Sequence, residues 1–113
     1  MSLRTFIPIL ELSDEATAKI DAYDLTGFDG APIDGADQPV KGFAQYPAEV
    51  GAQFSNIALG VGPSKASGII AKGDRLVTVD AKTVKKAPAD AENAFATALT
   101  AAGDGEFVDY LIK

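Results

Sequence analysis

The side chains in this 113-residue chain that can do chemistry are carboxylates, lysines, hydroxyls and three tyrosines, because the sequence contains no histidine and no cysteine. The absence of histidine and cysteine excludes imidazole bases, thiol nucleophiles, disulfides and the usual zinc ligands. The serines stand in no Gly-x-Ser-x-Gly setting and no Ser-x-x-Lys spacing. Ser64 and Lys65 are adjacent, which directs their side chains apart in an extended chain. We therefore expect no catalytic residue and no enzymatic activity.

Four aspartates of the first half could supply oxygen ligands to a cation: Asp24, Asp29, Asp34 and Asp37. Their spacing does not match the calcium loop D-x-D-x-D-G, and two of them precede glycine, which is typical of turns. We interpret them as turn residues and expect no metal. The glycines complete neither G-x-G-x-x-G nor a Gly-Lys-Ser/Thr phosphate loop, so we also expect no cofactor.

The net charge of −6 arises entirely in the first half of the chain. Residues 1–56 hold nine acidic and three basic side chains, whereas residues 57–113 hold seven of each. Such a surface repels a phosphate backbone, so nucleic acid is not an expected partner. The only basic cluster, Lys82, Lys85 and Lys86, is interpreted as a solvated strand edge. No apolar run reaches the length of a membrane helix, so no membrane partner is expected either.

The elements that position these groups are predicted to be short strands. Alternating apolar residues between turn signals predict strands over residues 18–25, 40–46, 53–61, 75–80, 82–87 and 106–112. Residues 26–42 are rich in glycine, proline and aspartate and predict a long loop or two hairpins, and Gly62-Pro63 predicts the end of a strand. Residues 89–102 fit either a helix, by propensity, or an alternating strand. The fold class is mainly β, a small antiparallel barrel or sandwich with long loops.

The N-terminal segment combines an apolar run, Phe6 to Leu10, with a proline at its centre. Pro8 has no N–H donor and disfavours a place in the protein's own sheet. We therefore predict an extended N-terminal arm over residues 1–15, followed by a single β-rich domain over residues 16–113. The segment lacks the basic start and long apolar stretch of a signal peptide.

The part of the chain from about residue 40 to residue 113 carries five stretches whose order is distinctive: 41–51, 57–61, 66–76, 83–87 and 94–112. The most telling parts are Gly73-Asp74-Arg75-Leu76 and the ending, where Ala-Leu, Gly-Asp-Gly-Glu and a hydrophobic strand follow in order. Together they resemble the capsid cement or decoration proteins of tailed bacteriophages and prophages, similar in role to the lambda-type head decoration proteins. The family pattern reads residues 95–100 as a strand, and we adopt that reading over the helix.

This resemblance implies a structural protein without cofactor that is made in the bacterial host cytoplasm. It would sit as a homotrimer on the outer capsid surface of the virion, with the major capsid protein as partner. Apolar residues on both faces of the last predicted strand also favour self-association. The candidate capsid contacts are the apolar residues of the arm: Leu3, Phe6, Ile7, Ile9 and Leu10. In the alternative, Phe6 and Ile9 cover the bottom of the barrel.

Two other classes of protein remain open. Pro32-Ile33-Asp34-Gly35 faintly suggests a trimeric β-fold nucleotide hydrolase of the deoxyuridine-triphosphatase kind, but the tyrosine and arginine expected soon after the aspartate are missing. A non-catalytic β-rich binding module for a small ligand or carbohydrate, or another phage structural protein, is the other alternative. Binding modules of that kind usually display tryptophan or tyrosine beside amides, and this chain has no tryptophan.

Overall fold

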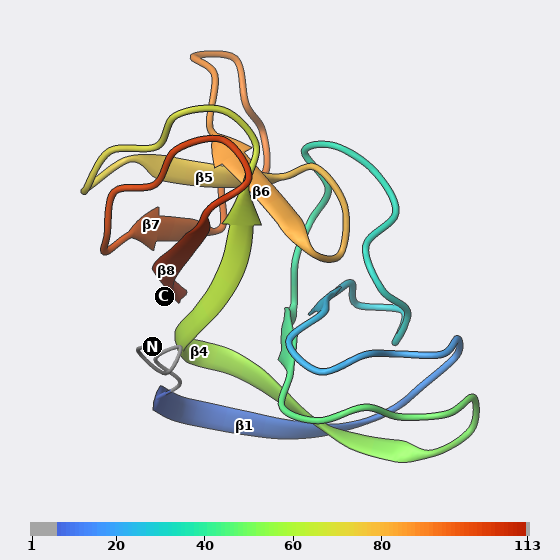
Figure 1. The fold of residues 1–113 in the computed structure, drawn as a ribbon. Coiled ribbons are helices and arrows are strands. Elements are labelled where there is room, and N and C mark those ends of the chain that lie inside the picture. The colour runs from blue at the N-terminus through green and yellow to red at the C-terminus, as the bar shows by residue number, and fades with distance from the viewer. Residues whose placement is uncertain (1–6, 113) are drawn as a thin grey trace.

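The computed structural model describes residues 7–112, with side chains from Leu10 onward. Every regular element in this range is a strand, as Figure 1 shows. The strands are β1 (Ile7–Glu15), β2 (Leu25–Thr26), β3 (Gly42–Ala44), β4 (Gln53–Ala66), β5 (Arg75–Thr78), β6 (Thr83–Lys86), β7 (Ala96–Ala98) and β8 (Phe107–Ile112).

Five of the strands close into a barrel in the order β4-β6-β5-β7-β8, because β8 pairs back onto β4. All pairings are antiparallel except β4 with β6, where Lys65 lies opposite Thr83. Buried apolar side chains fill the interior, among them Leu76, Val84 and Val108. The prediction of a small, mainly β barrel with long loops is confirmed.

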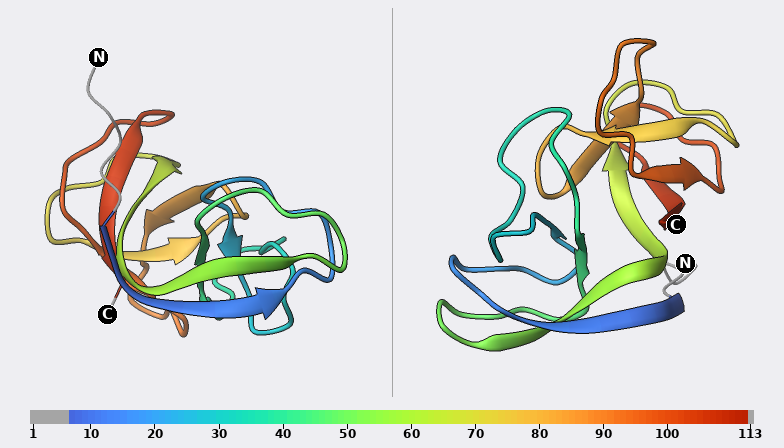
Figure 2. Two further views of the ribbon diagram at one scale, coloured as in Figure 1. Left: turned by 90° about the horizontal axis from the view of Figure 1, so that it is seen from below. Right: turned by 180° about the vertical axis from the view of Figure 1, so that it is seen from behind.

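Strand β4 belongs to two layers of the molecule. Its first half pairs with β1 on one side and β3 on the other, and its second half pairs with β8 and β6. Figures 1 and 2 show the strand bending between these halves, so that one layer crosses below the barrel. The ring of Phe43 on β3 reaches the barrel core, where it meets the ring of Tyr110 edge-on at 6.0 Å between centroids.

The prediction that Gly62-Pro63 ends a strand is wrong, because β4 continues to Ala66. Lys65 donates its N–H to Lys82 O on the side of β6, while Ala66 donates to Glu106 O beside β8. Alternation places the nitrogen of Pro63 on the same side as that of Lys65, away from β8. No described strand pairs with residue 63 on that side, since β1 ends its pairing at Val61. The missing donor of the proline therefore costs no ladder bond.

The expectation that Pro8 keeps its segment out of the sheet is also wrong. Residues 7–15 form β1 and pair with β4, with Pro8 opposite Gly60. The register shifts between Pro8 and Leu10 and again between Leu10 and Glu11. Irregular pairing on a strand with one paired side tolerates a proline, because a nitrogen without hydrogen can face the open side. The division into an arm of residues 1–15 and a domain of residues 16–113 stays a prediction.

No regular strand forms over residues 18–24. Ile20 makes an isolated bridge with Ala48, and Tyr23 has a left-handed backbone with φ of 67°, which interrupts the extended chain. Of the predicted stretch of residues 18–25, only Leu25 lies in a strand, where it begins β2. The segment instead covers a second, smaller core made of Ala16, Ile20, Ala44, Ala48 and Phe54.

The ambiguous segment near residue 97 is a strand, as the family pattern indicated. Ala96 lies opposite Ile112 and Arg75 lies opposite Thr97, so β7 joins β5 to β8 and closes the barrel. The interpretation of the lysines around residue 85 as a strand edge holds for part of β6. Lys85 and Lys86 pair with β5 alone, whereas Thr83 and Val84 pair with β4. Barrel closure, which the local sequence does not record, places only the start of β6 inside the sheet.

Candidate functional site

A basic side chain ties the segment before β2 to the barrel. Lys82 Nζ lies 2.9 Å from Asp21 Oδ2 and 2.5 Å from Asp24 Oδ1. Asp24 is buried, and its other oxygen accepts the Asp21 N–H at 3.0 Å. Partial burial acts to lower the pKa of Lys82, but the hydrogen bonds to Asp24 and Asp21 outweigh it and raise the pKa. Lys82 therefore stays charged and serves as a structural clasp.

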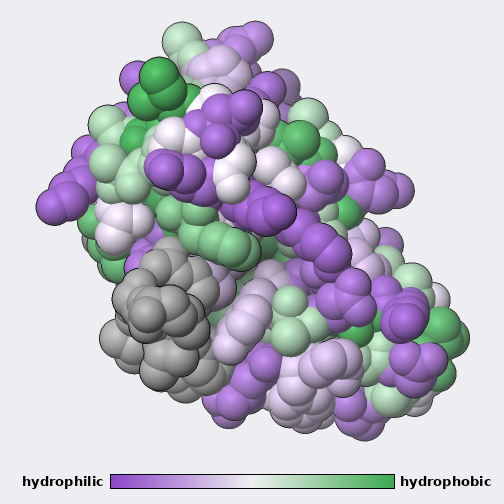
Figure 3. Space-filling model, viewed as in Figure 1, coloured by the Kyte–Doolittle hydropathy of each residue, from purple (hydrophilic) through white to green (hydrophobic). Residues whose placement is uncertain are grey.

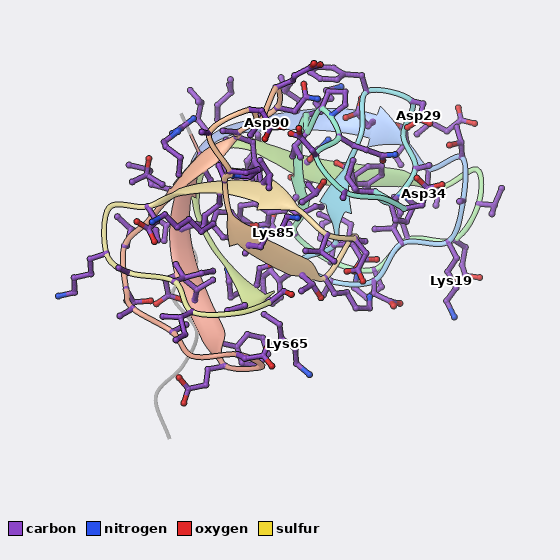
Figure 4. The ribbon with its side chains drawn as sticks, turned by 90° about the horizontal axis from the view of Figure 1, so that it is seen from above. Lys19, Asp29, Asp34, Lys65, Lys85 and Asp90 are labelled. Carbon is purple, nitrogen blue, oxygen red and sulfur yellow. The ribbon has the colours of Figure 1, made fainter. Side chains whose placement is uncertain are left out.

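Beside this clasp lies a groove of about 340 Å³. Two aromatic rings line it, Tyr23 with 37% and Phe107 with 49% of its surface exposed. Lys65 lies at the groove and extends away from the body in Figure 4. The remaining lining residues are Ala22, Asp24, Pro63, Ser64 and Lys82. The groove is thus an apolar, aromatic surface with a cationic rim.

The left-handed backbone of Tyr23 holds its ring at this groove. The Tyr23 N–H donates to Ala44 O at 2.8 Å, and the ring lies 6.3 Å from that of Phe43 between centroids. A tyrosine with positive φ costs conformational energy that glycine or asparagine would avoid. The Tyr23 ring therefore lies between the groove and the buried ring of Phe43.

A second polar cluster links the strands of the lower layer. The carboxylate of Asp14 accepts Lys41 Nζ at 2.6 Å and Asn56 Nδ2 at 3.0 Å, and Thr26 Oγ1 lies 3.1 Å from Asn56 Oδ1. Burial acts to raise the pKa of Asp14, but the hydrogen bonds from Lys41 and Asn56 lower it on balance. Each of the four side chains has a hydrogen-bond or ion-pair partner within the cluster, so the cluster is a structural support.

The predicted capsid contacts fall in different places. Leu3 and Phe6 lie outside the described residues, and Ile7 and Ile9 belong to β1. Leu10 is 43% exposed and its neighbour in the strand, Leu12, is also exposed. The structure leaves their role as contacts a prediction.

Sequence reasoning missed the most exposed large apolar side chains: Phe28 at 71%, Val50 at 68% and Ile69 at 83%. Each lies one residue from a glycine, which is the signal that could have placed it on a turn. Figure 3 shows that apolar residues on one face form separate patches among polar ones. Such patches suit several small contacts better than one large apolar interface.

Three of the four aspartates considered as cation ligands have separate partners of their own. Asp24 binds Lys82, Asp29 accepts the Ala31 N–H, and Asp37 accepts the N–H groups of Glu92 and Asn93. Within residues 7–112, no group of three or more potential ligands that could hold a metal ion is found. The same range contains no helix long and apolar enough to cross a membrane.

Comparison with known proteins adds one informative likeness. No family model matches the chain, and no curated protein matches it. Among solved structures, the chain is similar to the head fiber gp8.5 N base of bacteriophage phi29, with a TM-score of 0.65 and 21% sequence identity. The likeness covers 92% of this chain and 93% of that one. The two chains therefore share a fold over nearly their whole lengths.

Proposed function

We propose that this chain is a non-enzymatic structural protein that binds the outside of a phage or prophage capsid shell as a homotrimer and strengthens it. The observation that carries the proposal is the shared fold with a phage head fiber base over 92% of the chain. The resemblance of residues 40–113 to capsid decoration proteins supports it independently, because it rests on the order of sequence stretches.

The physical character of the surface fits such a role. The charged clusters of the described residues tie loops and strands to one another, and the exposed apolar side chains are scattered. Individually weak contacts become effective when three copies act together, because the first contact raises the effective concentration of the others. Leu3, Phe6, Ile7, Ile9 and Leu10 are the proposed contacts with the major capsid protein.

The proposal is tested with empty capsid shells assembled from the major capsid protein of the phage or prophage that carries this chain's gene. The purified chain should sediment with the shells, saturate at a number of copies divisible by three, and raise their melting temperature. A chain of the same charge with an unrelated fold serves as the control for adhesion. Saturating chain that neither sediments with the shells nor changes their stability contradicts the proposal.

A further inference from the structure

We infer that the exposed Phe28 of one copy docks in the aromatic groove of a second copy, between Tyr23 and Phe107, with Asp29 placed against Lys65. The inference deepens the proposed function and rests on its homotrimer. It assigns the contact by which one subunit holds the next.

The docking element is an exposed aromatic side chain on an anchored turn. Phe28 is 71% exposed, and the residues around it are fixed from both sides. Thr17 Oγ1 donates to Asp29 O at 3.0 Å, and Thr17 N–H donates to Gly30 O at 3.0 Å. The Asp29 carboxylate closes the turn by accepting the Ala31 N–H at 3.2 Å. An aromatic ring held out on such a turn loses little conformational freedom on docking.

The receiving groove has the size and the apolar lining that an aromatic side chain needs. Its two rings and Pro63 offer an apolar slot, and its volume of about 340 Å³ has room for an aromatic side chain. Aromatic rings favour edge-on or offset contact with one another, which the pairing of Phe28 with Tyr23 and Phe107 would provide.

The charges at the groove and beside Phe28 are complementary, which favours a second copy of this chain as the occupant of the groove. Lys65 and Asp29 form no ion pair with any residue in the range 10–112, in contrast to the paired Lys41 and Lys82. An aromatic residue followed directly by a carboxylate is what the groove with its lysine rim requires, and Phe28-Asp29 supplies this pair.

The two surfaces are separate patches of one molecule. Phe28 lines hollows with residues such as Pro39 and Ala58, and no residue of those hollows lines the groove. Contact between two different patches on identical chains is heterologous, and it produces a closed ring when the rotation between copies completes a circle. A three-fold ring uses each turn and each groove once.

The first test uses the absence of cysteine from the chain, since only introduced thiols react. The double variant Phe28→Cys with Phe107→Cys, treated with a short thiol-specific crosslinker, should give covalent dimers and trimers on a denaturing gel. Each single variant is the matched control, because it places only one thiol at each proposed contact and so offers no second thiol for the crosslinker to reach. A double variant that crosslinks no more than the single variants overturns the inference, as does a wild-type chain that is monomeric at tens of micromolar.

The second test exchanges the charges across the contact. Asp29→Lys and Lys65→Asp should each raise the concentration at which the trimer dissociates by about tenfold, and combining them should restore most of the wild-type value. Lys85→Asp, at a lysine that does not line the groove, is the control for a change in net charge. Single variants that dissociate like wild type, or a pair that shows no recovery, overturn the inference.

Shell binding by the wild-type chain separates this inference from the proposed function. Trimers that survive the substitutions while the wild-type chain still binds shells show that another surface joins the subunits. Variants that stay trimeric but lose shell binding show that the groove takes a segment of the shell protein, which also overturns the inference. Substitutions that dissociate the trimer of a chain that does not bind shells leave the contact standing and contradict the function.

Discussion

The ring of Phe43 lies directly against the backbone of Gly62, so closely that a Cβ built on the glycine would fall 2.7 Å from the ring atoms Cε1 and Cζ. Phe43 is fully buried and also meets the ring of Tyr110. Gly62 is therefore the point at which the bent β4 strand lets the lower layer pack onto the barrel.

We expect Gly62→Ala to lower the free energy of unfolding by about 1–3 kcal/mol, because the buried ring has no space into which to move. Urea denaturation measures the change. The double variant Gly62→Ala with Phe43→Leu should lose less stability than the sum of the losses of the two single variants, since the smaller leucine side chain relieves the clash. Strict additivity of the two substitutions would contradict the packing described.

Tyr110→Phe should leave the stability unchanged or raise it by up to about 2 kcal/mol, although the residue lies at the centre of the barrel. The Tyr110 hydroxyl has no hydrogen-bond partner among the described residues, and burial raises the pKa of Tyr110 far above its ordinary value. Removing the oxygen removes a desolvated polar group and keeps the ring contacts with Phe95 and Phe43. A loss of stability in thermal denaturation would reveal a partner for the hydroxyl.

Lys82→Met should destabilise the fold by about 1–3 kcal/mol, because it leaves the carboxylate of Asp24 buried without its cation. The effect is reduced by the exposure of the lysine itself, which is 58% at the side chain. Lys85→Met is the matched control, since Lys85 lies close by in β6 and makes no ion pair among the described residues. Equal effects of the two substitutions would show that the clasp contributes nothing.

The stability should be nearly constant between about pH 5 and 8, since no histidine titrates there. The hydrogen bonds from Lys41 and Asn56 outweigh burial and lower the pKa of Asp14, and those from Lys82 lower the pKa of Asp21. Groups with a depressed pKa stabilise the fold above their ordinary value of 3.8 and lose this contribution as the pH falls below it. Thermal melts across the acid range test this, and Lys41→Met should make the decline shallower.

Deleting residues 1–6 should abolish shell binding and leave the melting temperature within a few degrees of wild type, if Leu3 and Phe6 contact the capsid protein. The reason is that β1 begins its pairing with β4 at Ile7 and keeps that ladder in the truncated chain. Calorimetry and shell sedimentation together distinguish the outcomes. A truncated chain that melts many degrees lower assigns Phe6 to the core instead.

The sequence predicted the fold class because alternation and turn residues are local signals. It predicted most of the strands after residue 40 for the same reason. It missed β1, however, and it ended the strand that begins at Gln53 at residue 61, whereas β4 continues to Ala66. Both errors involve proline, and in both the outcome depends on which side of a strand remains unpaired. That property follows from pairing between distant residues, such as Ile7 with Val61, and has no local signature.

The groove was unpredictable for a related reason. Tyr23, Lys65 and Phe107 come from three separate parts of the chain. The pairing of β4 with β8 places Lys65 opposite Phe107, and the hydrogen bond of Tyr23 N–H to Ala44 O holds Tyr23 to the layer beside the barrel. The glycines beside Phe28 were visible in the sequence and mark a turn, yet nothing local distinguishes an exposed phenylalanine in a turn from one that folds back into the core.

The bent β4 strand also determines how the protein would respond to mechanical load. Because β1 runs antiparallel beside the first half of β4, a pull at Ile7 along the strand axis shears the hydrogen bonds of that ladder together instead of opening them one after another. The second half of β4 is one of the strands of the barrel, so the force passes through continuous backbone into a closed sheet. A tether at the start of β1 would thus be resisted by the whole fold.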